Sequence, residues 1–124
     1  MNYFRLMSTK PLGPYTPAVR AGDFVFVSGQ LGMRDGTLVD GGVTEQTTQA
    51  VANLAERLGE MGASLTDVVK TTCFLIDMNE FATFNEAYMA AFGDHRPARS
   101  TIAVRELPAN GQVEIEAVAF HPGG

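Results

Sequence analysis

Apolar residues near the start of the chain follow the two-residue repeat of a β-strand. Residues 24–28, Phe-Val-Phe-Val-Ser, are aromatic or β-branched up to the serine, and this composition predicts a strand. Phe24, Phe26 and Ser28 share one face of that strand, and the two valines share the other. A turn is expected just before it, over residues 20–23. The predicted strand is therefore apolar on both faces.

The pattern then changes from a hairpin to a helix. Residues 31–39 carry an Asp-Gly pair between two short apolar runs, which is typical of a tight hairpin turn. Beyond it, Thr44 is expected to cap a helix with Glu45 in its first turn, and Gly62 is expected to end that helix. Apolar side chains recur every three or four residues and form one helical face, made of Val51, Leu54, Leu58 and Met61.

The second half of the chain repeats a strand and a helix. Residues 68–76 predict a strand that is apolar on both faces. One face takes Val68, Phe74 and Ile76, and the other takes Val69, Cys73 and Leu75. Asp77 or Asn79 is expected to cap a second helix, which Gly93 ends and Pro97 keeps from resuming. Its apolar stripe is made of Met78, Phe81, Phe84, Tyr88 and Phe92.

Two further strands complete the pattern. Residues 100–104 predict a short strand. Residues 113–120 predict a longer strand, which follows a turn over residues 107–112. The longer strand alternates between two faces, one with Val113, Ile115, Ala117 and Ala119, the other with Glu114, Glu116 and Val118.

The order of these elements predicts an α+β fold, a single-layer mixed β-sheet with two helices. Right-handed crossovers would place both helices on one face of the sheet. The other face then stays uncovered, although residues 24–28 and 68–76 are apolar on both faces. An exposed apolar sheet face is unfavourable in water, so another copy of the chain is the expected cover. We therefore expect a homo-oligomer.

Composition and charge narrow the class of protein. With 124 residues, 45% of them apolar, the chain is expected to fold as one domain over residues 1–124. Nine basic and 14 acidic residues give a net charge of −5, which disfavours nucleic acid and anionic membranes as partners. Residues 1–10 do not resemble a signal peptide, and no run is long enough to span a membrane. The lone Cys73 is expected to be an inert core thiol in a cytoplasmic protein without a zinc site.

Arg99 and Glu114 are the main candidates for chemistry. Arg99 either binds a carboxylate through its planar guanidinium or is a surface arginine at a strand end. Glu114 either holds a water and moves a proton or, with Glu116, belongs to a solvated strand face. Ser28 is expected to donate a hydrogen bond, because no histidine is placed to activate it as a nucleophile. Tyr15 is either a packing residue or a pocket hydroxyl.

Several short motifs stand in the order found in one protein family. They are Gly13-Pro14-Tyr15, Val27-Ser28-Gly29-Gln30, Phe81 with Asn85 and Tyr88, Pro97-Ala98-Arg99-Ser100-Thr101, Leu107-Pro108, and Val113-Glu114-Ile115-Glu116-Ala117. Together these motifs, which run over nearly the whole chain, resemble the RidA family, also called YjgF or L-PSP. The resemblance implies a chorismate-mutase-like fold and a homotrimer whose active sites lie in the clefts between subunits.

The resemblance also implies an activity. This is the hydrolytic deamination of reactive 2-imino acids or their enamines, such as 2-iminopropanoate and 2-iminobutanoate, to 2-oxo acids and ammonia, without metal or cofactor. By motif, Arg99 is implied to bind the substrate carboxylate and Glu114 to orient the attacking water. The implied pocket residues are Tyr15, Ser28, Gly29, Asn85 and Thr101. Many active relatives have cysteine where this chain has Thr101, and Arg96 brings a second arginine close to the implied site.

Two other functions stay open at this point. The same cleft and Arg99 would also suit a module that binds a small carboxylate without turnover. Some relatives carry the name of RNA-cleaving translation inhibitors, but a net charge of −5 with two lysines, Lys10 and Lys70, disfavours a phosphate-binding surface. The expected partners are therefore small 2-imino acids and other copies of the chain, with neither nucleic acid nor membrane.

Overall fold

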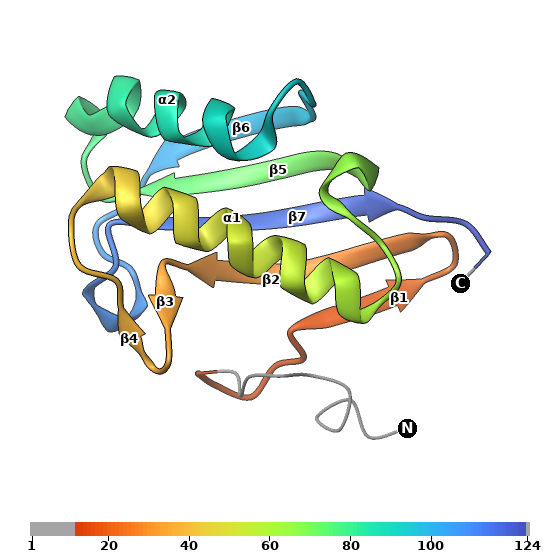
Figure 1. Cartoon of the computed structure of the whole chain (residues 1–124). Coiled ribbons are helices and arrows are strands. Elements are labelled where there is room, and N and C mark those ends of the chain that lie inside the picture. Colours follow the sequence, from red (N-terminus) through yellow and green to blue (C-terminus); the bar gives the residue numbers. More distant parts are fainter. Residues whose placement is uncertain (1–11, 124) are drawn as a thin grey trace.

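A five-stranded mixed sheet forms the centre of the molecule (Figure 1). The structure is a computed structural model, and it describes residues 12–123; the predicted absence of a leader in residues 1–10 lies outside this range. The strand order is β1-β2-β7-β5-β6, and only β5 and β6 are parallel neighbours. The strands are β1 (Ala18–Ala21), β2 (Phe24–Leu31), β5 (Val68–Leu75), β6 (Ala98–Ala103) and β7 (Val113–Phe120).

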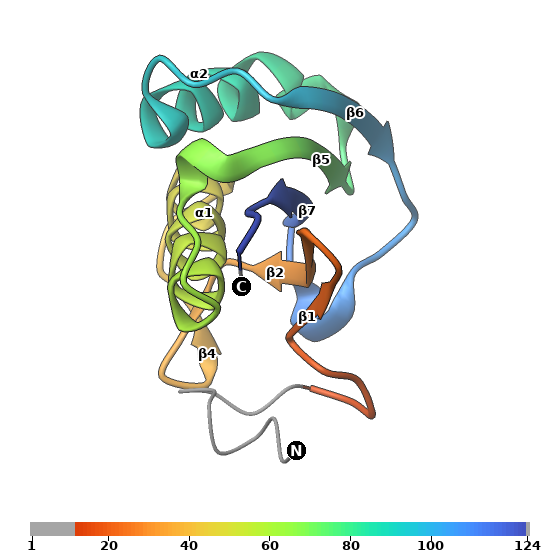
Figure 2. The ribbon, with the colours of Figure 1, turned by 90° about the vertical axis from the view of Figure 1, so that its right-hand side faces the viewer.

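Both α-helices pack against one face of this sheet, as the crossover rule predicts (Figures 1 and 2). They are α1 (Val43–Glu60) and α2 (Phe81–Phe92). The predicted hairpin is present as β3 (Met33–Arg34) and β4 (Thr37–Leu38), with positive φ angles of 55° and 85° in the Asp-Gly turn. Three short 3₁₀ turns, Leu65–Asp67, Met78–Glu80 and Pro108–Asn110, join the larger elements. Within residues 12–123, no helix is both long and apolar enough to span a membrane.

The core lies between the two helices and the sheet face that they cover. The alternation predicted for β7 is confirmed, because the four residues of its predicted apolar face are at most 3% exposed, namely Val113, Ile115, Ala117 and Ala119. The alternation in β2 is also confirmed, since Val25 and Val27 are buried whereas Phe24 and Phe26 are exposed. Leu54, Leu58 and Phe84 meet these strands from the two helices. Cys73 is fully buried among them, as expected of a core thiol.

The predicted faces of β5 are wrong at the start of the strand. Val68 is 1% exposed and lies on the same side as Cys73, whereas Val69 is 45% exposed. The cause is a shift in the pairing with β7 between Val68 and Lys70, where β5 advances two residues while β7 advances one. Such a bulge reverses the side on which the preceding residue lies, and a simple two-residue repeat cannot anticipate it.

The predicted start of α1 is also displaced. Gly42, not Thr44, is the N-cap residue, and the carboxylate of Glu45 accepts a hydrogen bond from the Gly42 backbone N–H at 2.8 Å. Glu45 thus closes the first turn from within the helix, so no side chain is needed at the cap itself. The predicted stop is confirmed, because Gly62 follows the helix with a φ of 82°.

The predicted cap of the second helix, Asp77 or Asn79, is displaced, because the N-cap residue of α2 is Glu80. Asp77 instead caps the 3₁₀ turn Met78–Glu80 just before α2, where its side chain accepts a hydrogen bond from the backbone N–H of Asn79. The predicted apolar stripe is partly wrong, because Met78 and Phe81 are exposed at the surface. A 3₁₀ turn, Met78–Glu80, precedes α2, and its tighter winding changes the direction of these two side chains. Phe84, with Tyr88 and Phe92 further along α2, is buried as predicted.

The sheet face opposite the helices is rich in large apolar side chains. Six of them are between 39% and 48% exposed, namely Val19, Phe24, Phe26, Val69, Ile102 and Phe120. Phe24 and Phe120 face each other across β2 and β7 with ring centroids 5.3 Å apart. The two-sided apolar pattern of the strands is therefore present in the structure. The cover by further copies of the chain stays a prediction.

Candidate functional site

The candidate site residues fall into two groups in the structure. Tyr15, Ser28, Gly29 and Glu114 line one cavity of about 530 Å³, to which Glu116 also contributes. We call this cavity, defined by these five residues, the acidic cleft. The second group consists of Arg99 and Thr101 on β6 and Asn85 on α2, and none of the three lines the acidic cleft.

A bulge in β2 builds the floor of the acidic cleft. Between Val27 and Gln30, β2 advances three residues while its partner β7 advances two, so Ser28 and Gly29 occupy the irregular step. Gly29 lies directly against the Glu114 side chain, and a Cβ added at Gly29 would lie 2.7 Å from the carboxyl carbon of Glu114. The absence of a side chain at Gly29 therefore permits the close approach of the carboxyl group.

Ser28 fastens the segment that carries Tyr15 to the sheet. Its hydroxyl donates a hydrogen bond to the Thr16 carbonyl at 2.8 Å, and its backbone N–H donates to the Pro17 carbonyl at 2.9 Å. The Tyr15 hydroxyl accepts a hydrogen bond from the Leu12 N–H at 3.3 Å, and Tyr15 itself is 41% exposed. The Ser28 hydroxyl is thus a hydrogen-bond donor, as the sequence predicts.

Glu114 is a half-buried carboxyl group in this cleft. Burial raises its pKa, and the nearby negative charge of Glu116 raises it further. Among residues 12–123, neither a hydrogen bond nor an ion pair engages its carboxylate. A carboxylate of this kind has a stronger tendency to accept a proton than an ordinary surface glutamate.

Arg99 lies on the other side of the sheet, toward α2. In the parallel pairing of β5 with β6, Arg99 stands opposite Thr71 and Thr101 opposite Cys73. Thr71 and Cys73 are fully buried under the helices, so Arg99 and Thr101 project to that same side. The guanidinium carbon of Arg99 lies 5.0–5.6 Å from the ring centroids of Phe81, Phe84 and Tyr88.

Two buried polar atoms lie in the Arg99 group of residues. They are the side-chain oxygens of Asn85 and Thr101, and within the described part of the chain neither has a hydrogen-bond partner. A buried oxygen without a partner is costly, so such atoms favour a ligand or a second chain at this edge of the sheet. The free arginine and these two oxygens together form a polar surface at the edge strand β6.

One chain does not bring Arg99 and Glu114 together. Glu114 is paired with Phe74 of β5, and Glu116 with Thr72, both on the face away from the helices. Arg99 is paired with Thr71, whose side chain is buried on the face that the helices cover. The two candidate groups of one chain therefore project to opposite sides of the same sheet.

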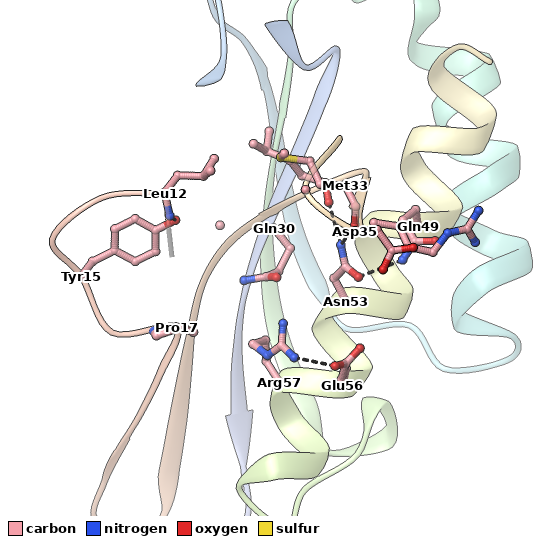
Figure 3. Close-up of a pocket in the computed structure, with 14 residues that line it drawn as sticks. Leu12, Tyr15, Pro17, Gln30, Met33, Asp35, Gln49, Asn53, Glu56 and Arg57 are labelled. Carbon is pink, nitrogen blue, oxygen red and sulfur yellow. Dashed lines mark hydrogen bonds and ion pairs between the residues drawn. The ribbon is translucent and has the colours of Figure 1, made fainter. Parts of the chain in front are cut away.

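A second cavity, of about 440 Å³, lies where residues 12–17 approach α1 and the β3–β4 hairpin (Figure 3). It shares Tyr15 and Gly29 with the acidic cleft. Its polar groups engage one another: Asn53 accepts from Gln49 and donates to two carbonyls, and Arg57 pairs with Glu56 at 2.8 Å. Sequence reasoning missed this cavity. The only signal was the recurrence of Gln49, Asn53 and Glu56 every three or four residues along one polar helix face.

The remaining ionisable groups offer less chemistry. Burial raises the pKa of the Cys73 thiol to about 11, so this thiol is protonated and poorly nucleophilic at neutral pH. Among residues 12–123, no three His, Cys, Asp or Glu side chains are grouped so that they could hold a metal ion.

Comparison with known proteins gives consistent matches over almost the whole chain. The family model described as Endoribonuclease L-PSP matches residues 7–121. A RutC family protein of Pyrococcus abyssi is 43% identical, with 94% of each chain covered. A human protein named 2-iminobutanoate/2-iminopropanoate deaminase is 46% identical, with 88% of this chain and 81% of the human protein covered.

A solved structure agrees with these sequence matches. RidA from an Antarctic Psychrobacter superimposes with a TM-score of 0.85 at 36% identity, covering 90% of this chain and 91% of the other. The family model, the identities and the superposition all point to the family that the sequence motifs resemble. The chain belongs to the L-PSP family, which includes RidA and YjgF.

Proposed function

We propose that this protein is a hydrolytic deaminase of 2-imino acids, such as 2-iminopropanoate and 2-iminobutanoate, and that residues 1–124 act as one domain. The name of the human relative supports the reaction. The observation that carries the proposal is the pairing of chemical groups. Arg99 has an unneutralised guanidinium at an edge strand, and Glu114 has a half-buried carboxyl group with a raised pKa. A 2-imino acid needs both, because it joins a carboxylate to an electrophilic C=N group.

Arg99 binds the substrate carboxylate in this proposal. A guanidinium donates two parallel hydrogen bonds to a carboxylate, which fixes both the position and the orientation of the adjacent C=N carbon. The aromatic rings beside Arg99 accept no conventional hydrogen bond, so its N–H donors stay available for the substrate. Asn85 and Thr101 contribute their unpartnered oxygens to the same pocket wall.

Glu114 moves the protons of the reaction. As the water oxygen attacks the protonated imine carbon, Glu114 accepts one proton from that water, and a tetrahedral carbinolamine forms. Glu114 then returns the proton to the nitrogen, the C–N bond breaks to release ammonia, and the hydroxyl proton passes through Glu114 to that ammonia as the carbonyl forms. The products are the 2-oxo acid and ammonium, so atoms and charge balance. Tyr15 and Ser28 line the cleft in which the water is held.

A homotrimer with shared clefts reconciles the reaction with the geometry. Arg99 and Glu114 of one chain face opposite sides of the sheet, so a cleft that holds both takes them from two subunits. The six exposed apolar side chains of the open sheet face supply a surface for subunit contact. We therefore place Arg99 of one subunit against the acidic cleft of its neighbour.

The proposal is tested by generating the imine in place. A pyridoxal-phosphate dehydratase releases 2-iminobutanoate, and formation of the 2-oxo acid is followed with and without this protein. We expect acceleration by the wild type and a loss of at least about 10²-fold for Arg99→Lys, because lysine keeps the charge but loses the planar fork. Arg105→Lys, an exposed arginine two residues beyond β6, is the matched control and should leave the rate unchanged. An Arg99→Lys protein with wild-type turnover would defeat the carboxylate-binding role.

The alternative of a carboxylate-binding module predicts tight binding of a 2-oxo acid without any acceleration in the same assay. The name of the family model raises RNA cleavage as a further alternative. The net charge of −5 and the two carboxyl groups of the acidic cleft oppose the binding of a polyanion. RNA cleavage that disappears in Glu114→Gln would favour that alternative over ours.

A further inference from the structure

Arg99 is held by an aromatic surface rather than by a counter-ion. Its guanidinium carbon lies 5.0 Å from the Tyr88 ring centroid, the shortest of its three ring distances. Among the residues that the structure describes, it has no hydrogen bond or ion pair. A cation is attracted to the electron-rich face of an aromatic ring. The position of the guanidinium therefore depends on the positions of the rings.

Tyr88 is the one of these three rings that carries a hydroxyl group and is fixed by a hydrogen bond. It is 4% exposed, and it lies between Phe84 and Phe92 with centroid distances of 5.6 Å and 4.6 Å. Its hydroxyl forms a 2.7 Å hydrogen bond with the Thr71 hydroxyl, and Thr71 is fully buried. The Thr71 oxygen also accepts a weak hydrogen bond from the Cys73 thiol at 3.8 Å. The far end of the Tyr88 ring is thus anchored to the central part of β5.

Thr71, which anchors the Tyr88 ring, and Arg99 lie side by side on neighbouring strands. Thr71 stands directly opposite Arg99 in the parallel β5–β6 pairing. The backbones of Arg99 and Thr71 are paired, the Thr71 hydroxyl is bonded to Tyr88, and the Tyr88 ring faces the Arg99 guanidinium. A shift of the Tyr88 ring would change the direction of the guanidinium without altering the strand that carries it.

We propose that the Thr71–Tyr88 hydrogen bond is a positioning device that fixes the Arg99 guanidinium for carboxylate binding. This inference rests on the proposed function for the identity of the carboxylate, a 2-imino acid or its 2-oxo acid product. Tyr88 and Thr71 do not touch the reacting atoms. They act through Arg99, with which the Tyr88 ring is in contact.

The test measures the order of Arg99 and the affinity for product separately. Relaxation of the Arg99 side-chain N–H is recorded by NMR, with its signal identified by its loss in Arg99→Lys, and binding of 2-oxobutanoate is titrated. In Tyr88→Phe and Thr71→Val, we expect a lower order parameter for this N–H and roughly 3–10-fold weaker product binding, the size of one hydrogen bond. Thr71→Ser keeps the hydroxyl and should behave like the wild type.

Thr72→Val is the matched control, because Thr72 is the next residue of β5 and is paired with Glu116 on the opposite face. It should leave the Arg99 order parameter unchanged. Tyr88→Phe retains the ring and serves even if Thr71→Val fails to fold. Wild-type order and wild-type affinity in a folded Tyr88→Phe would overturn the positioning role. A wild type that shows no imine turnover would instead defeat the proposed function. The order parameter of the Arg99 N–H would still show whether the Thr71–Tyr88 hydrogen bond fixes the guanidinium.

Discussion

Gly29→Ala should inactivate the enzyme while leaving its fold intact. An alanine Cβ at this position would lie 2.7 Å from Cδ and 2.9 Å from Cγ of Glu114, closer than the ordinary contact distance of 3.4 Å. The Glu114 carboxyl carbon must therefore move by at least about 0.7 Å. Gly29 does not have a positive φ, so the backbone accepts alanine without strain. A misplacement of about 1 Å near the chemistry costs on the order of 10²-fold in rate.

The assay is 2-oxo acid formation from an imine generated in place, together with thermal unfolding. We expect roughly a 10²-fold loss in rate with a change in stability within about 1 kcal/mol, because the displaced carboxylate ends a flexible side chain. Gly59→Ala is the matched control, since Gly59 is an exposed α1 residue with open space around its Cβ position. That variant should gain stability and keep its activity. Wild-type turnover in a folded Gly29→Ala protein would refute the proposed placement of Glu114.

Three further predictions concern the ionisable groups. Glu116→Gln removes the negative charge that helps to raise the Glu114 pKa, so the acid limb of the profile of kcat/KM against pH should move to lower pH. An acid limb that stays in place or moves to higher pH would contradict this. The folded-state pKa of Glu114 lies above its unfolded value, so its ionisation costs stability at neutral pH. Glu114→Gln should therefore raise Tm at pH 7, and the gain should vanish once the pH falls below about 4, as differential scanning calorimetry would report. Cys73→Val should keep nearly full turnover, because the buried thiol, with a pKa of about 11, is protonated; a large loss with the fold preserved would show a role for it.

The sequence was most informative where one pattern governs a whole element. The alternation of β7 and the buried stripe from Phe84 to Phe92 appear in the structure as predicted. Predictions from the hydrophobic repeat were wrong where the backbone is irregular. The bulge at Val69 and the 3₁₀ turn before Phe81 each change the phase of a repeat, and neither leaves a mark in hydrophobicity alone.

The candidate site shows a similar division. Motifs identified Arg99 and Glu114 as candidates, but spacing along the chain could not show that they face opposite sides of the sheet. That placement depends on the register of β5 against both of its neighbours, which is a property of long-range pairing. The contact of Arg99 with Tyr88 was likewise hidden, because the aromatic stripe of α2 predicts core packing and gives no indication of which side chain covers it.

The opposite directions of Arg99 and Glu114 have a consequence for mixed assemblies. Suppose that each cleft takes Arg99 from one subunit and Glu114 from the next. A subunit without Arg99 then still supplies a functional Glu114 to one cleft, and a subunit without Glu114 still supplies a functional Arg99 to another. Two inactive variants, Arg99→Ala and Glu114→Gln, would then complement each other when unfolded together and reassembled. In an equal, random mixture about a quarter of the clefts would combine the two intact halves. Two damaged alleles of this gene in one cell would accordingly restore part of an activity that neither supplies alone.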